Sequence, residues 1–304
     1  MPLIYFLAPL ATVMIWSGNM TINQLTVGTI APSSIAFLRW FLALLVMTPL
    51  VLPATLKHLP EIRRNWPKLA TLGLLGMGLW QGLGYVAAET TTATNMGILA
   101  AMVPLLTVLL SALILREPPT LGGVIGGLLA FVGVSILLGQ GNPLSLLKLE
   151  VAFGDALMVI AAICYALYGV MLKRWQMNLP PWVMLYAQVC FAVLFLLPPY
   201  LLGPMTPIDG QNVWLILYAG IPASIITTFL WMRAVRQIGA NQASIFINLM
   251  LLFSALIAMA FLDERIASFH LYGGLLILAG VIMAQTFTRP LVGMAGKKAR
   301  SAQQ

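Results

Sequence analysis

The sequence contains very little charge. Only 8% of its 304 residues are Asp, Glu, Lys or Arg, whereas 61% are apolar, and the mean hydropathy is +0.96. Because soluble domains carry about 25% charged residues, this composition excludes a water-soluble globular protein and predicts an integral membrane protein. The composition also excludes a nucleic-acid-binding protein. Despite the net charge of +8, the chain has no water-exposed basic surface that could bind nucleic acid.

Cysteine and histidine are equally scarce, with two residues of each. Cys164 and Cys190 both lie in apolar stretches, which favours small buried side chains over a disulfide or a metal pair. The sequence has no H-E-x-x-H motif, no G-x-S-x-G motif and no Walker-type phosphate-binding loop. We therefore expect no catalytic residues, no ATP-driven engine, no cofactor and no metal site.

Long apolar runs are abundant. A helix that crosses a bilayer needs about 20 apolar residues, and glycines, prolines and charged loops separate such runs from one another. Ten runs are long enough, at residues 3–23, 33–52, 69–88, 94–115, 121–139, 153–172, 182–202, 212–234, 241–262 and 269–288. The predicted fold class is therefore an all-α integral membrane protein with ten transmembrane helices.

The two halves of the chain repeat each other. A constant offset of 147 residues aligns 85–134 with 232–281 without a gap, and it pairs Glu117 with Glu264. An internal repeat in a membrane protein indicates a transporter built from two related halves. The predicted domains are a first five-helix repeat at 1–139, a connecting loop at 140–151, a second five-helix repeat at 152–288, and a polar tail at 289–304.

The positive charges predict the orientation. If the N-terminus lies in the cytoplasm, the inner loops and the tail hold 13 of the 16 Lys and Arg residues, including four in a loop at 53–68. The outer loops hold two, and Arg39 lies within a span. Under the positive-inside rule, both termini are cytoplasmic and the second repeat is inverted relative to the first.

Polar and aromatic residues gather inside several spans. Trp16, Asn19 and Asn23 lie on one helix face, and Gln81 and Tyr85 are one turn apart. Each residue alone is also explained by packing between helices, but together they predict an amphipathic cavity lined by spans 1, 3, 4, 6, 8 and 9. The predicted substrate contacts are Trp16, Asn19, Arg39, Gln81, Tyr85, Asn95, Tyr165, Tyr168, Trp231 and Asn248.

Arg39 is the single charged residue well inside a span. A buried guanidinium needs a carboxylate, carbonyl groups or water. Two interpretations stay open: attraction of an anionic group of the substrate, or structural pairing and snorkelling. The acidic residues all fall in loops or at span ends, which favours facilitated diffusion over proton antiport and leaves Glu89 and Asp155 as candidate gate residues.

Glycine and proline positions suggest how the protein moves. We expect Gly84 of the glycine-rich third span and Pro104 of the fourth to form part of a gate, with Pro104 kinking its helix. The repeat partner of Pro104 is Leu251, so we expect the two halves to bend differently. Two overlapping G-x-x-x-G pairs at 122–127 predict close helix packing.

Three stretches together resemble a known family. They are Ile15-Trp16-Ser17-Gly18-Asn19, Phe37-Leu38-Arg39-Trp40, and the run from Tyr85 through Pro104 and Glu117 to Gly133. They resemble the EamA type of the drug/metabolite transporter superfamily over residues 3–288, and within it the bacterial amino-acid exporters of the YddG type.

That resemblance implies an inverted five-plus-five repeat, a central cavity, and export of amino acids, aromatic and other neutral ones, by alternating access. Two departures, Glu89 where the family often has Lys and the neutral Gln188 as the repeat partner of Arg39, leave the substrate open.

Two alternatives remain beside the amino-acid exporter. The first is an exporter of other metabolites or drugs. If its substrates were organic cations, it would need an acidic residue in the cavity, and the sequence shows none there. A receptor or scaffold that transports nothing would not require polar faces on so many helices. The expected partners are a small molecule and the lipid bilayer, with no nucleic acid; the oligomeric state stays open, and a monomer is compatible with the sequence.

Overall fold

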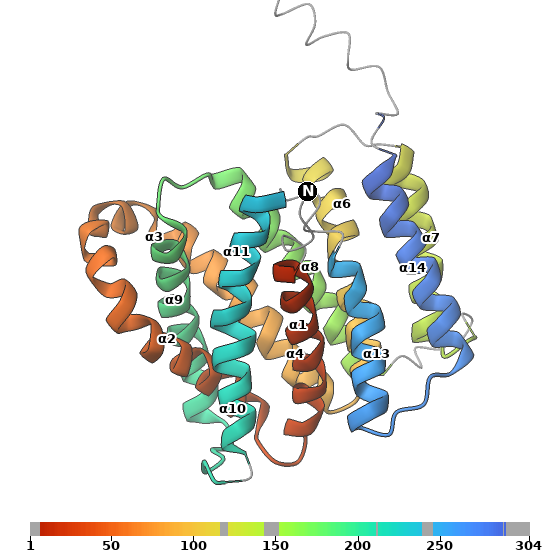
Figure 1. Cartoon of the computed structure of the whole chain (residues 1–304), viewed down its shortest axis with the longest axis horizontal. Helices are drawn as coiled ribbons and strands as arrows, with labels where there is room; N and C mark the ends of the chain where they lie inside the picture. The colour runs from red at the N-terminus through yellow and green to blue at the C-terminus, as the bar shows by residue number, and fades with distance from the viewer. Residues whose placement is uncertain are drawn as a thin grey trace, which may run out of the picture.

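A computed structural model describes residues 7–115, 121–142, 152–210, 212–238, 246–287 and 289. Within these ranges every regular element is helical, and the helices stand side by side between two ends of one bundle (Figure 1). The prediction of an all-α membrane protein is confirmed.

The first half of the chain contributes seven α-helices and one π-helical turn. They are α1 (Leu7–Thr26), α2 (Pro32–Lys57), α3 (Leu59–Gly73), the π-helical turn η2 (Leu74–Leu79), α4 (Trp80–Ala88), α5 (Ala93–Ala100), α6 (Val103–Ile114) and α7 (Leu121–Leu138). The segment α3–η2–α4 forms one continuous stretch of helix.

The second half has the same order of elements. They are α8 (Phe153–Trp175), α9 (Pro181–Leu202), α10 (Val213–Gly220), the π-helical turn η4 (Ile221–Ile226), α11 (Thr227–Ile238), the 3-10 turn η5 (Phe246–Leu249), α13 (Met250–Phe261) and α14 (Ser268–Thr286).

The offset of 147 residues seen in the sequence also relates the boundaries of these elements. It superposes η2 on η4 at both ends, the start of α6 on the start of α13, and the start of α7 on the start of α14. A π-helical turn is rare and is often found at functional sites. Two such turns at equivalent positions indicate that each half folds as a copy of the other.

The interruption of the fourth span lies where the two halves meet. This span is interrupted at residues 101–102, just before Pro104, as a proline should cause. A side chain on Gly97, one turn earlier, would collide with Ser254 of α13. In the second half Leu251 takes the place of Pro104, and the 3-10 turn η5 precedes α13, but the residues before η5 lie outside the described ranges. The expectation that the two halves bend differently therefore stays a prediction.

The predicted loop at 53–68 is wrong. Helix α2 continues through Pro49 and Pro53 to Lys57, and α3 begins at Leu59, so that only His58 separates them. The apolar run reports how much of a helix lies in lipid, whereas the helix itself continues into the polar region. The charged residues of this segment therefore lie on helical turns.

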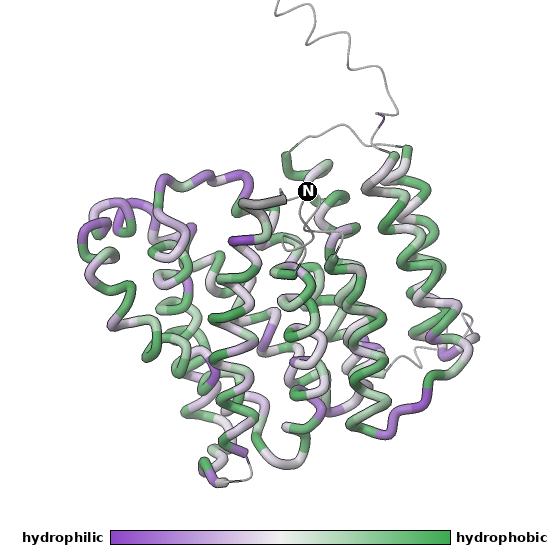
Figure 2. The backbone as a smooth tube through the Cα atoms, in the orientation of Figure 1, coloured by the Kyte–Doolittle hydropathy of each residue, from purple (hydrophilic) through white to green (hydrophobic). Residues whose placement is uncertain are grey.

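Six helical segments are long and apolar enough to cross a membrane: Pro32–Lys57, Leu59–Ala88, Ala93–Ile114, Phe153–Trp175, Pro181–Leu202 and Val213–Trp231. Shorter apolar helices lie at Leu121–Leu137, Leu252–Phe261 and Ser268–Met283. The chain is thus a multi-pass membrane protein, and the count of ten spans stays a prediction. Figure 2 shows the hydrophilic residues mainly at the two ends of the bundle.

Helices α7 and α14 pack as an antiparallel pair at one edge of the bundle (Figure 1), where the amide of Gly122 donates to the carbonyl of Phe287 at 3.1 Å. A Cβ on Gly133 would lie 2.6 Å from the Gly273 carbonyl, and one on Gly280 would collide with the Gly126 carbonyl. The offset of 147 pairs Gly126 with Gly273 and Gly133 with Gly280. The contact of Gly133 with Gly273 therefore corresponds, in the repeat, to the contact of Gly280 with Gly126.

A second close approach joins α3 to α9 and generates a prediction. A Cβ on Gly73 would lie 2.5 Å from the Gln188 carbonyl, whereas one on Gly82 of α4 would meet only the Leu196 side chain, at 3.9 Å. Because Gly73→Ala forces two backbones apart, we expect it to lower the free energy of unfolding by about 1–3 kcal/mol. Denaturation in detergent measures this.

Gly82→Ala is the matched control, because it adds the same methyl group in open space on the same stretch of helix. We expect it to change the free energy of unfolding by no more than about 0.5 kcal/mol. Equal losses in the two variants would contradict the close packing of α3 on α9.

Candidate substrate cavity

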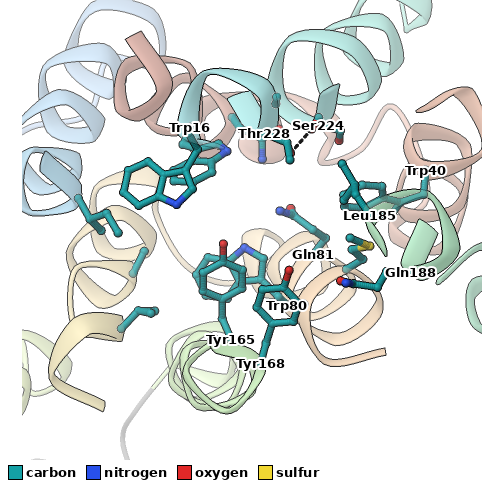
Figure 3. Close-up of a pocket in the computed structure, with 18 of the residues that line it drawn as sticks. Trp16, Trp40, Trp80, Gln81, Tyr165, Tyr168, Leu185, Gln188, Ser224 and Thr228 are labelled. Atoms are coloured by element: carbon teal, nitrogen blue, oxygen red, sulfur yellow. Dashed lines mark hydrogen bonds between the residues drawn. The ribbon is translucent and has the colours of Figure 1, made fainter. Parts of the chain in front are cut away.

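A cavity of about 320 Å³ lies in the middle of the bundle (Figure 3). This volume falls within the range of about 300–1,000 Å³ that is typical of small-molecule sites. Its wall is drawn from both halves of the chain and includes residues of η2 and η4, the two π-helical turns. Six aromatic side chains contribute to it: Trp16, Trp40, Trp80, Tyr165, Tyr168 and Trp231.

The aromatic rings are organised in two groups. Trp16 and Trp231 have ring centroids 5.5 Å apart. Trp80 and Tyr165 are 5.0 Å apart, and Tyr165 stacks on Tyr168 at 5.5 Å. Figure 3 shows Trp16 on one side of the open space, opposite Trp80 and Tyr165. Such pairs of rings make a large, rigid apolar surface with polar edges.

The polar part of the wall is made of amides and hydroxyls. The described residues that line the cavity include no Asp, Glu, Lys, Arg or His. Three buried polar atoms of the lining residues have no hydrogen-bond partner: Asn19 Oδ1, Gln188 Oε1 and Trp40 Nε1. Buried polar atoms are nearly always satisfied in native structures, so the hydrogen-bonding capacity of these three atoms is unmet in this conformation, in which each atom is itself buried within the wall.

Arg39 lies behind this wall and is fully buried. Its Nη1 atom donates to Gln81 Oε1 at 2.7 Å and to the Tyr85 hydroxyl at 3.1 Å. Its Nη2 and Nε atoms donate to Ser224 Oγ at 2.9 and 3.3 Å. Gln81 and Ser224 line the cavity, so Arg39 is separated from the open space by one layer of side chains.

One end of the bundle, which we call the α4–α5 end, is closed by buried polar contacts. Asp155 at the start of α8 accepts hydrogen bonds from the Thr91 hydroxyl and from Asn95 Nδ2. Gln24 of α1 donates to the Thr91 carbonyl, which ties α1 to the same group. Three elements from both halves are therefore joined at this end.

Glu264, in the segment between α13 and α14, closes the same end from the other side. Its carboxylate accepts from the backbone amides of Ala93 and Thr94, at 2.8 and 3.2 Å, and from the Thr94 hydroxyl at 2.6 Å. These amides belong to the first turn of α5, where a negative charge also complements the helix dipole. One side chain of the second half thus caps a helix of the first half.

The cavity extends toward the opposite end, which we call the α8–α9 end. Its lining reaches Leu172, near the end of α8, and Pro181, the first residue of α9. Toward the α4–α5 end it stops at Gln81 and Ala100, which lie seven residues from the ends of their helices, or about 10 Å. The cavity therefore approaches only one end of the bundle.

The sequence profile of the EamA-like transporter family matches this chain twice, over residues 3–139 and 152–286. The chain belongs to the EamA-like transporter family. Members of this family are membrane transporters of small molecules and not enzymes. The predicted resemblance to the EamA type is confirmed, whereas the likeness to exporters of the YddG type stays a prediction. The two matches also agree with the repeat in the elements.

Several relatives of this chain are named as uncharacterized transporters. The uncharacterized transporter YyaM of Bacillus subtilis (strain 168) is 29% identical over 278 residues, covering 90% of each chain. An uncharacterized transporter of Archaeoglobus fulgidus is 27% identical and covers 90% of this chain and 94% of its own. Protein PecM of Dickeya dadantii (strain 3937) is 24% identical and covers 75% of this chain and 76% of its own.

A protein of known crystal structure has the same fold. It is 18% identical in sequence and superposes with a TM-score of 0.64, covering 95% of this chain and 98% of its own. At this identity the likeness establishes the fold alone.

The structure distributes the predicted contacts of this EamA-family chain between the wall and the layer behind it. Arg39, Tyr85 and Asn95 are buried behind the wall, with Asn95 bound to Asp155, and the side chain of Asn248 lies outside the described residues. Six of the predicted contacts line the cavity: Trp16, Asn19, Gln81, Tyr165, Tyr168 and Trp231.

Each of the two predicted gate residues lies shortly after an irregular segment of helix. Pro104 is buried in the first turn of α6. Gly84 is in a regular turn of α4, where a Cβ would lie 3.4 Å from Asn23 Nδ2, and the π-helical turn precedes it at Leu74–Leu79. Their role in gating stays a prediction.

The predicted lining omitted two spans that contribute to it. Trp40 of α2 and Gln188 of α9 both line the cavity, as do Ser224 and Thr228 on and after η4. Gln188 carried a signal, since a buried amide inside an apolar run needs a partner. Trp40 carried none, because a tryptophan in a membrane helix is equally consistent with lipid-facing packing.

The cap formed by Glu264 generates a prediction. Glu264→Gln replaces an acceptor-only carboxylate by an amide whose nitrogen faces backbone donors. We expect the free energy of unfolding in detergent to fall by about 1–3 kcal/mol, because buried donors lose their partner. The control is Asp263→Asn, since Asp263 is exposed and Asn also tolerates its φ of 53°. A loss in both variants, or in neither, would contradict the cap.

Proposed function

We propose that this EamA-family transporter exports amino acids, aromatic and other neutral ones with broad selectivity, by alternating access. The observation that carries the proposal is the uncharged cavity, in which two groups of aromatic rings surround amides and hydroxyls. Aromatic walls fit apolar side chains of several sizes, and amides and hydroxyls form hydrogen bonds with the polar groups of an amino acid.

We further propose that both termini are cytoplasmic and that the membrane is the bacterial inner membrane. Most described Lys and Arg residues support this orientation, because they lie on segments at the α8–α9 end: Lys57, Arg63, Arg64, Lys68, Lys173, Arg174, Arg233 and Arg289. Arg265 lies at the opposite end. In this orientation the cavity approaches the cytoplasm, which is the side from which an exporter takes its substrate.

Alternating access would then consist of opening the α4–α5 end while the α8–α9 end closes. The inverted repeat gives a physical reason, because two copies of one fold can exchange conformations about a shared site. Ten spans in two five-helix repeats, at 1–139 and 152–288, with a loop at 140–151 and a tail at 289–304, are part of this proposal. Gly84 and Pro104 would act in the gate.

A drug or organic-cation exporter is the alternative that one observation favours. Six aromatic side chains could hold a cation over their ring faces. The described lining contains no carboxylate to complement such a charge, so we give the amino-acid exporter precedence.

Counterflow in liposomes that contain only this protein tests the proposal. We expect saturable uptake of labelled L-phenylalanine into liposomes loaded with unlabelled neutral amino acids, without a proton gradient. Trp16→Ala and Tyr165→Ala each remove a large contact surface, so we expect the concentration for half-maximal uptake to rise roughly tenfold.

The control is Tyr272→Ala on α14, because this aromatic side chain is 63% exposed and does not line the cavity. Uptake by this variant should match the wild type. If the protein transports cationic dyes but no amino acid, the amino-acid proposal is wrong and the drug exporter takes its place. If the folded protein transports no compound at all, a receptor or scaffold is favoured.

Cysteine labelling tests the orientation. In a background of Cys164→Ala and Cys190→Ala, we expect a membrane-impermeant maleimide to label Arg265→Cys in intact cells. Arg64→Cys should react only after permeabilisation, because its exposed position lies at the α8–α9 end. The two positions serve as controls for each other, and the reverse pattern would overturn the orientation.

A further inference from the structure

Arg39 keeps its charge inside the bundle without a carboxylate partner in the described part of the chain. All its hydrogen bonds go to neutral side chains, those of Gln81, Tyr85 and Ser224. The guanidinium also lies over the rings of Trp40 and Tyr85, 5.3 and 5.8 Å from their centroids. The hydrogen bonds engage four of its five N–H groups, but they leave its positive charge uncompensated in a medium of low dielectric.

The guanidinium fixes the direction of the Gln81 amide. Arginine has N–H donors and no acceptor, so only the amide oxygen can face it, and Nη1 donates to Oε1 at 2.7 Å. The amide nitrogen is thereby turned away from Arg39 and makes no hydrogen bond with a described residue. Figure 3 shows the Gln81 amide pointing into the open space of the cavity.

Ser224 anchors Arg39 without offering a donor to the cavity. Its hydroxyl oxygen accepts from Nη2 and Nε, and its only proton is donated to the Ala219 carbonyl at 2.8 Å. The donor that this group presents to a ligand is therefore the amide nitrogen of Gln81, with the positive charge of Arg39 directly behind it. A donor backed by a buried positive charge binds an anion.

We propose that Arg39 and Gln81 form an anion subsite that binds the carboxylate of the transported molecule. Gln81 makes the direct contact, and Arg39 is a positioning residue that orients the amide and supplies the charge. The inference rests on the proposed transport function and deepens it, because it makes a carboxylate necessary on the substrate.

Four probes that share one aromatic ring test the subsite by binding to the purified full-length protein. L-phenylalanine and 3-phenylpropionate carry a carboxylate, whereas L-phenylalaninamide and phenethylamine do not. Tryptophan fluorescence reports binding, because four tryptophans line the cavity. A charge-assisted hydrogen bond corresponds to about tenfold to a hundredfold in affinity, so we expect phenylalanine to bind at least about tenfold more tightly than its amide.

Variants separate a role in binding from a role in folding. Arg39→Met should bring the ratio of phenylalanine to phenylalaninamide affinity close to one, and Arg39→Lys should restore part of it. If Arg39 had only a structural role, its substitution would weaken the binding of all four probes equally. Arg39→Met removes the donor that the buried oxygens of Gln81 and Ser224 share, which costs stability. If this variant fails to fold, Gln81→Leu keeps Arg39 and removes the direct donor.

Gln188→Leu is the matched control, because it removes a second amide of the same cavity that does not contact Arg39. It should weaken binding and leave the ratio of acid to amide unchanged. Equal binding of phenylalanine and its amide by the wild type, or no binding of either carboxylate, overturns the subsite.

Two results distinguish a failure of the anion subsite from a failure of the proposed transport function. If 3-phenylpropionate binds in a manner that depends on Arg39 while no amino acid is transported, the subsite holds and the amino-acid proposal falls. If phenylalanine and its amide are transported equally well, the transport function holds and the subsite falls.

Discussion

Inside a bilayer a polar group must find its partner within the protein, because lipid offers none. This constraint accounts for the arrangement of the polar side chains in the bundle. Asp155 is surrounded by Thr91 and Asn95, Glu264 by the first turn of α5, and Arg39 by neutral oxygens. Each of these contacts joins different parts of the chain, and two amides of the cavity wall, Asn19 and Gln188, are among the buried groups whose hydrogen-bonding capacity is unmet.

The repeat explains why the cavity lies where it does. Helices α7 and α14 pair through glycines that the repeat exchanges, and they lie away from the cavity wall. The π-helical turns η2 and η4 occupy equivalent positions in the two halves and both contribute to the wall. A π-helical turn contains one more residue than an α-helical turn and frees backbone from regular packing. Two such turns facing one space give both halves an irregular, deformable segment at the site itself.

Local sequence patterns predicted the elements better than their ends or their faces. The buried position of Arg39 followed from its place in an apolar run, but its partners depend on how α2 crosses α4 and η4, which no local pattern encodes. The loop at 53–68 was wrong because hydropathy reports contact with lipid and not helix length. Trp40 was missed because a lone tryptophan does not reveal which face of α2 it occupies.

The layer of side chains between Arg39 and the cavity has a consequence for transport. A guanidinium in direct contact with a carboxylate forms a bidentate pair, and in a dry site such a pair dissociates with difficulty. A transporter must bind its substrate strongly enough to admit it and weakly enough to release it. With Gln81 between charge and ligand, the attraction persists because the medium screens it poorly, whereas the direct bond is that of a neutral amide. The tight contacts of Arg39 with Ser224 and Tyr85 keep the guanidinium from moving forward, so the charge selects a substrate without holding it.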